Sequence, residues 1–92
     1  MKVWVRAFAG LREILGDELT VELPDDSAMP VLLREISDHF PEAEELIYEP
    51  DGYLSDSLVL IINGNEVGTA YVEGALLADG DEVVLFPGVG GE

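Results

Sequence analysis

Past its midpoint the chain contains the segment Ser57-Leu58-Val59-Leu60-Ile61-Ile62-Asn63-Gly64. A continuous apolar run of this length predicts a strand that is buried on both faces and is therefore central in a sheet. An Asn-Gly pair after such a run is a strong hairpin signal, because both residues accept the positive φ angles of a tight turn. We therefore expect a central strand over residues 57–62 and a brief return strand around Glu66 and Val67.

Three other segments alternate between apolar and polar residues, as half-buried strands do. They cover residues 3–9, 19–23 and 82–86. The first two lie close together in the chain, so we expect them to pair as an antiparallel hairpin at an edge of the sheet. A short helical turn over residues 11–15, stopped by Gly16, is expected between them. Further turns are expected at residues 50–52 and 79–81.

The main helix is predicted over residues 28–40. Its apolar stripe, at helical spacing, consists of Val31, Leu32, Ile36, His39 and Phe40, with Leu33 beside it. Ser27 is a plausible N-cap, Pro30 suits the first turn, and Pro41 ends the helix. A further short helical segment is expected over residues 42–48.

The predicted order is strand, strand, helix, strand, short strand, strand. One long helix can cover one face of a mixed sheet of four or five strands. This is the order of the β-grasp architecture, an α+β fold with one main helix over the sheet. We therefore expect a β-grasp domain over residues 1–87 and a flexible glycine-rich tail over residues 88–92.

The charge of the chain is strongly unbalanced. Among its 92 residues, twenty acidic side chains face four basic ones, for a formal net charge of −16. Such a surface repels phosphate backbones and anionic lipids, so nucleic-acid and membrane partners are not expected. The acidity has two compatible explanations: adaptation of the whole surface to a salt-rich cytoplasm, which the even spread of acids favours, or attraction of a basic partner.

Several kinds of site are excluded or not indicated. The chain has no cysteine, which excludes disulfides, thiolate metal sites and cysteine nucleophiles. His39 is the only histidine and is expected to be structural, so we expect neither a metal site nor catalytic residues. No apolar run approaches the roughly 20 residues of a membrane span. The first residues lack the apolar core of a signal peptide, so a cytoplasmic location is expected.

One face of the sheet is expected to be left open by the single helix. If Val3, Val5 and Ala7 meet that helix, the side chains that point outward include aromatic ones. The predicted outward residues are Trp4, Phe8, Val84 and Phe86. An apolar patch of this kind often marks a surface for a partner protein. The alternative is that the segments 42–48 and 70–77 fold over it.

The chain ends in Phe86-Pro87-Gly88-Val89-Gly90-Gly91-Glu92. Proline lacks a backbone donor and stops a strand ladder. A pair of glycines without side chains forms a thin peptide that can enter the active site of another protein. The alternative is an ordinary frayed terminus.

Several stretches match one known family, and they keep its spacing over nearly the whole chain. They are Lys2 to Phe8, Leu11-Arg12-Glu13 with Gly16, Asn63-Gly64, and Asp79-Gly80-Asp81-Glu82-Val83 running into Phe86-Pro87 and Gly90-Gly91. These residues resemble MoaD and its ThiS relatives, the ubiquitin-like sulfur carriers of prokaryotes. The stretch from Asp79 to Gly91 is the specific part of the resemblance.

The resemblance implies a chemistry at the C-terminus. A ubiquitin-activating-type (MoeB-like) enzyme would consume ATP to adenylate the carboxylate of Gly91, which then becomes a thiocarboxylate. The tail, including Gly90, would enter the large (MoaE-like) subunit of molybdopterin synthase and deliver sulfur for molybdenum cofactor biosynthesis. No cofactor would be bound by the carrier itself.

The resemblance also implies where partners touch the chain. Phe8 and Phe86 align with aromatic residues that contact partners in the family. We expect the rest of the partner surface to include Trp4, Val84, Pro87 and Val89. A third family contact falls near Glu66, where the apolar side chain is lost or displaced.

Two other functions stay open. Acidic archaeal relatives serve as protein modifiers, whose Gly-Gly carboxylate forms isopeptide bonds with substrate lysines. The second open function is that of a binding protein that is never conjugated.

The chain departs from the family pattern at two places. The family commonly has two prolines where this chain has Pro87-Gly88, so the tail is expected to leave the sheet more loosely. Glu92 follows Gly91, so the carboxyl group of Gly91 is part of a peptide bond and is not the free carboxylate that the chemistry requires. Either a protease trims Glu92, or Glu92 is foreign to the natural chain, or this member is not activated.

Overall fold

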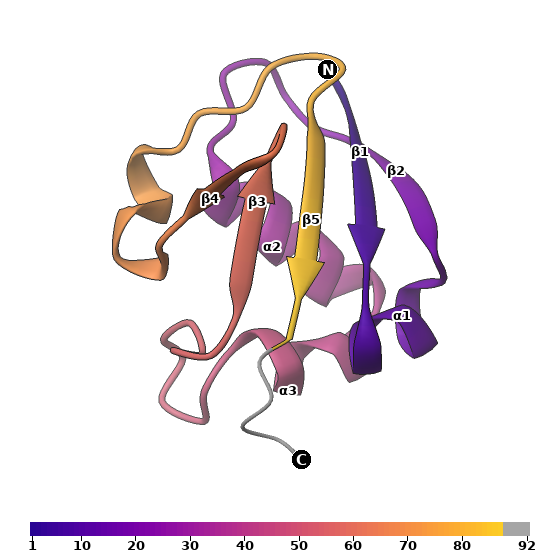
Figure 1. Ribbon diagram of the computed structural model, residues 1–92, viewed down its shortest axis with the longest axis vertical. Coiled ribbons are helices and arrows are strands. Elements are labelled where there is room, and N and C mark those ends of the chain that lie inside the picture. The colour runs from indigo at the N-terminus through magenta and orange to yellow at the C-terminus, as the bar shows by residue number, and fades with distance from the viewer. Residues whose placement is uncertain (88–92) are drawn as a thin grey trace.

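The computed structural model describes residues 1–87, which form a sheet of five strands with helices packed on one face (Figure 1). The strands are β1 (Lys2–Ala7), β2 (Glu18–Glu22), β3 (Val59–Ile62), β4 (Asn65–Val67) and β5 (Glu82–Phe86). The helices are α1 (Ala9–Leu15), α2 (Met29–His39) and α3 (Glu44–Ile47), with 3₁₀ turns η1 (Pro41–Ala43) and η2 (Thr69–Gly74). The tail expected at residues 88–92 lies outside the described residues.

The sheet is mixed, and its strand order is β2-β1-β5-β3-β4. The strands β1 and β5 are parallel, whereas the pairs β1–β2, β5–β3 and β3–β4 are antiparallel. With α2 as the main helix over one face, this is the predicted ubiquitin-like β-grasp fold. The hairpin of the first two strands lies at an edge of the sheet, as predicted.

The predicted strand over residues 57–62 is an inner strand, because β3 pairs with β5 on one side and β4 on the other, but its predicted burial on both faces is wrong. The middle strand of the sheet is β5, which pairs with β1 and β3. Within β3 only Leu60 is fully buried, while Val59, Ile61 and Ile62 are half-buried. The continuous apolar run misled because β3 places alternate apolar side chains on the face of the sheet opposite α2.

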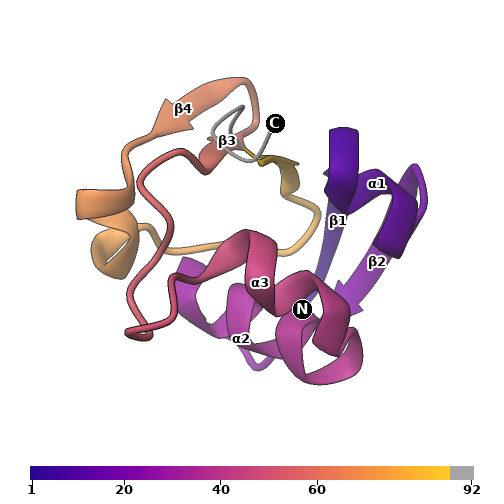
Figure 2. The ribbon, with the colours of Figure 1, turned by 90° about the horizontal axis from the view of Figure 1, so that it is seen from below.

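The hydrophobic core lies between the sheet and its helices (Figure 2). Strand residues Val3, Val5 and Ala7 point into it as predicted, with exposures of 0 to 2%. Helices α1, α2 and α3 each add apolar side chains to the same core. Their fully buried members include Leu11, Leu32, Leu33, Ile36 and Ile47.

Two details of α2 differ from the sequence prediction. The N-cap is Ala28, because the Ser27 hydroxyl donates instead to the carbonyl oxygen of Pro24 at 2.6 Å. Val31, which helical spacing places in the apolar stripe, is 42% exposed, and Leu33 is buried in the core instead. Pro30 does occupy the first turn. No helix in residues 1–87 is long and apolar enough to span a membrane.

The turns form where the glycines predicted them. Asn63 and Gly64 have φ angles of 50° and 87°, as the tight turn between β3 and β4 requires. The Asn63 side chain also joins this turn to the start of β5, donating to Asp81 Oδ1 at 2.9 Å and accepting from the Glu82 amide at 3.0 Å. The hairpin is therefore fixed against the central strand.

Candidate docking face and C-terminal tail

The open face of the sheet is defined by the strand register. Trp4 is paired with Glu82, and Arg6 with Val84, across β1 and β5. On the other side of β5, Val59 is paired with Phe86, and Ile61 with Val84. Because side chains alternate along a strand, all of these point away from α2. We use the term aromatic face for Trp4, Phe8, Val59, Ile61, Val84 and Phe86.

Two phenylalanines form the centre of this face. The rings of Phe8 and Phe86 are stacked, with centroids 5.6 Å apart and planes inclined by 19°. Phe8 follows β1 with an extended backbone, and its amide donates to the carbonyl oxygen of Leu85 at 3.2 Å. This bond continues the pairing of β1 with β5 and brings the two rings together at the end of the sheet where β5 finishes.

The aromatic face is open among the described residues. Trp4 is 43% exposed and Phe86 is 39% exposed, while Phe8 and Val84 are half-buried. The segments 42–48 and 70–77, which could have covered this face, pack on the opposite side of the sheet. Ile47 of α3 and Val72 of η2 are buried in the core on the α2 side. The predicted exposure is thus confirmed, whereas the role of these residues in binding partners stays a prediction.

Arg6 was missed as a member of this surface. Its guanidinium lies 6.0 Å from the centre of the Phe8 ring and 3.9 Å from the carboxylate of Glu82. Val59 and Ile61 were missed as well, since the central assignment of their strand hid which way they point. Alternation along the first strand already places Arg6 on the side of Trp4 and Phe8, whereas the outward direction of Val59 and Ile61 follows from the strand register.

Pro87, the last residue before the tail, directly follows Phe86 of the stacked pair. Pro87 ends the ladder after β5 and is buried, although it is predicted to belong to the partner surface. Its role in binding stays a prediction. Val89, Gly90, Gly91 and Glu92 lie outside the described residues. Within residues 1–87 the structure therefore brings Phe8, Phe86 and Pro87 together.

The other sites considered are surface features. His39 is exposed on α2, and its Nδ1 atom lies 3.0 Å from the carbonyl oxygen of Glu35. It faces solvent rather than the core. No group of three or more metal-ligating side chains gathers within the described part of the chain.

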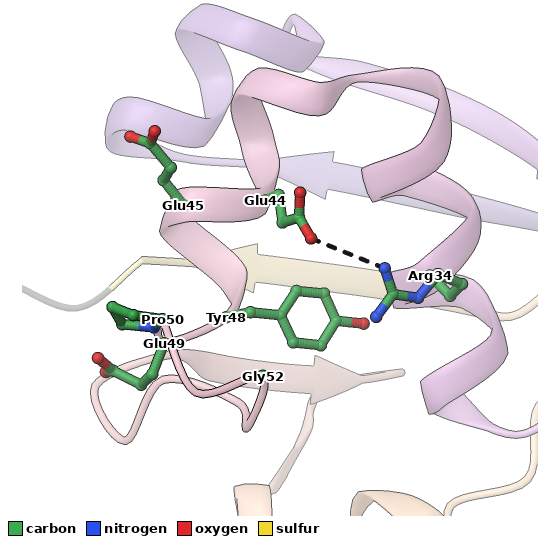
Figure 3. A pocket seen from close by; sticks show the side chains of 7 residues that line it. All are labelled: Arg34, Glu44, Glu45, Tyr48, Glu49, Pro50 and Gly52. Carbon is green, nitrogen blue, oxygen red and sulfur yellow. Dashed lines mark ion pairs between the residues drawn. The ribbon is translucent and has the colours of Figure 1, made fainter.

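A surface pocket of about 560 Å³ lies beside α3 (Figure 3). The Arg34 guanidinium lies over the Tyr48 ring at 4.8 Å and pairs with Glu44 at 3.8 Å. Burial raises the pKa of the Tyr48 phenol above its ordinary value of 10.0. The contacts of Arg34 with Tyr48 and Glu44 join α2 to α3 and the residue that follows it.

Comparison with known proteins identifies the family. The sequence model of the ThiS family matches residues 5–91. The chain belongs to the ThiS family. Comparison with curated proteins gave no match. Solved structures of similar chains support the assignment of this protein to the ThiS family.

Three of those structures cover nearly the whole chain. Small archaeal modifier protein 1 of Haloferax volcanii is 28% identical, with a TM-score of 0.85 and 100% coverage of both chains. The protein of the same name from Methanosarcina acetivorans is 34% identical, with a TM-score of 0.75 and coverage of 99% and 96%. A candidate molybdopterin converting factor, subunit 1, of Pyrococcus furiosus is 32% identical, with a TM-score of 0.73 and coverage of 97% and 99%.

Proposed function

We propose that this ThiS-family protein is a sulfur carrier, the small subunit of a molybdopterin synthase, and that it acts through Gly91. One observation supports this most directly. Phe86 of the stacked pair is followed by Pro87, the last residue before the tail. A partner that binds the aromatic face is therefore held next to the segment on which it acts.

The chemistry proceeds in two balanced steps. A carboxylate oxygen of Gly91 attacks the α-phosphorus of ATP on an activating enzyme, which forms an acyl adenylate and releases pyrophosphate. A sulfide nucleophile then displaces AMP and leaves a thiocarboxylate. The chain has no cysteine, so its own side chains offer no thiol to compete for the activated carbonyl.

Activation at Gly91 requires that Glu92 be removed. The match to the ThiS family ends at residue 91, one residue before Glu92. We infer that hydrolysis of the peptide bond between Gly91 and Glu92 precedes adenylation. A trimming protease thus joins the activating enzyme and the large synthase subunit as a proposed partner.

The test compares forms of the protein with the activating enzyme of the same cell. A form that ends at Gly91 is expected to exchange pyrophosphate with ATP and to give the mass of an acyl adenylate. The form that keeps Glu92 and the form with Gly91→Ala are the matched controls, and neither is expected to react. Equal adenylation of the Gly91→Ala form would contradict the proposal.

A second candidate is a protein modifier, joined through Gly91 to lysines of other proteins. It is favoured by the likeness to small archaeal modifier protein 1 of Haloferax volcanii, which covers all of both chains. It predicts higher-mass conjugates in cells and Gly-Gly remnants on target lysines. If such conjugates are absent and deletion abolishes molybdenum-enzyme activity, the modifier function is excluded.

A third function, binding without conjugation, has its own test. It predicts that deletion of residues 90–92 leaves activity in cells unchanged. Loss of activity on that deletion, with the fold intact by circular dichroism, would rule it out.

A further inference from the structure

The strand β2 has a free edge on the side away from β1. It is one of the two edge strands of the sheet (Figure 1). The amide of Leu23 donates to the carbonyl oxygen of Met1, and the amide of Ala7 donates to that of Asp17. Hydrogen bonding alternates along an antiparallel ladder. In this register Leu19 and Val21 bond to β1, whereas the backbone groups of Glu18, Thr20 and Glu22 point outward.

A groove runs beside this free edge. Its volume is about 440 Å³, and it lies between β2 and α2. Its lining includes the apolar residues Leu19, Ile36 and Phe40 and the polar residues Glu35 and His39. A strand added to β2 would point every second side chain over this groove, because side chains alternate between the faces of a sheet. The groove therefore suits the apolar residues of an added strand.

The charges at this edge are acidic. Glu18 and Glu22 lie opposite Arg6 and Lys2 in the ladder, but neither carboxylate has an ion pair within 4 Å among residues 1–87. Glu22 also lines the groove, together with Glu35. A strand docked here would meet carboxylates at both ends of the pairing region.

The same carboxylates disfavour a second copy of the chain. Two β2 strands paired antiparallel about Thr20 would place Glu18 of each copy opposite Glu22 of the other. Like charges directly opposite in a sheet are destabilising, whereas opposite charges stabilise the pair. The occupant that fits is a basic strand, with cationic side chains opposite Glu18 and Glu22.

We propose that β2 and its groove form a second binding site, distinct from the aromatic face and the tail. The site takes an extended peptide segment in which apolar and basic residues alternate. The peptide adds a sixth strand to the sheet through the outward amide and carbonyl of Thr20. The site does not depend on any chemistry at Gly91.

The test uses the full chain and a capped peptide of sequence Ser-Arg-Val-Thr-Val-Arg-Ser. Binding is followed by amide chemical shifts at the lowest salt concentration that keeps the protein folded. We expect the largest shifts in residues 18–22 and 35–40. A peptide with glutamate in place of arginine is expected not to bind. Methylation of the central threonine nitrogen, which removes the donor to Thr20, is expected to weaken binding about tenfold.

Variants of the protein separate local pairing from overall charge. Thr20→Pro removes the outward donor and is expected to weaken binding about tenfold. Glu22→Lys is expected to weaken it much more than Glu73→Lys, which changes the net charge equally on η2, away from β2. If Thr20→Pro fails to fold, the N-methylated peptide with the unaltered protein makes the same test.

Several results would overturn the proposal. They are the absence of saturable binding, shifts centred on Trp4 and Phe86, equal weakening by Glu22→Lys and Glu73→Lys, or indifference to N-methylation. Self-association that shifts the β2 amides would assign the edge to a second copy instead.

Discussion

Two adjacent residues of β5 should separate stability from partner binding. Leu85 is fully buried against the helices, while Phe86 lies on the aromatic face and is 39% exposed. Truncation of either to alanine removes a large apolar side chain from the same strand. Only the Leu85→Ala change leaves a closed cavity, because solvent can fill the space left by Phe86.

The expected magnitudes follow from these positions. Leu85→Ala should lower the free energy of unfolding by about 3–5 kcal/mol, as for a buried leucine whose site cannot collapse. For Phe86→Ala, the buried part of the ring contributes about 1–2 kcal/mol. Its stack on Phe8 adds about 0.5 kcal/mol, the low end for an aromatic pair, since the rings are partly solvated. The difference of about 2 kcal/mol corresponds to about 8–16 °C in Tm for a domain of this size.

Urea unfolding at one fixed salt concentration measures the loss of stability in each variant. Titration with the activating enzyme or the large synthase subunit measures the loss of partner binding. Phe86→Ala should weaken binding by about 2 kcal/mol or more, as expected for a central aromatic contact. Leu85→Ala should bind normally while it stays folded. Equal losses of stability would place Phe86 in the core and refute the two-face reasoning, and unchanged binding by Phe86→Ala would show that partners do not hold the aromatic face.

Three further measurements test other parts of the structure. Asn63→Ala should cost about 1–2 kcal/mol in urea unfolding, because it removes two side-chain hydrogen bonds and strains a position with φ of 50°; the neighbouring Asn65→Ala should cost less than about 0.5 kcal/mol, and equal costs would contradict this account. The raised pKa of Tyr48 contributes stability that is present below pH 10.0 and lost as the pH rises through the folded-state value, so the urea midpoint of Tyr48→Phe should fall less steeply above that pH, and parallel curves would show that the phenol is not desolvated. With a net charge of −16, the urea midpoint should rise between low salt and about 1 M salt, where the Debye length is about 3 Å; a midpoint that falls would mean that self-repulsion does not limit stability.

Local signals were enough to predict most of the fold. The strand at residues 82–86, the turn at Asn63-Gly64 and the stop at Gly16 depend on neighbours in the sequence, and all three are confirmed. The position of β3 depends instead on which strands pair across long separations. The apolar run of residues 57–62 indicates burial, but it does not show which face of the strand is covered by a helix and which face stays partly open to solvent.

The candidate site was predictable to the extent that alternation determines it. The outward direction of Trp4, Val84 and Phe86 follows from the alternation of side chains along β1 and β5. One buried residue in each strand is enough to show which alternate residues face outward. Arg6 carries a charge, so a search for outward apolar residues passes over it. Its place beside Phe8 follows from the same alternation, because Arg6 and Phe8 are two residues apart along an extended chain.

Under the proposed function, the position of β5 explains how a reactive tail and a folded body would work together. As the last strand in the sequence and the central strand in the sheet, β5 pairs with β1 and β3 at once. The stack of Phe8 on Phe86 therefore exists only when the two ends of the chain have already come together. A partner that requires this stack before it acts on Gly91 would activate folded molecules and pass over unfolded ones, although both contain the same tail.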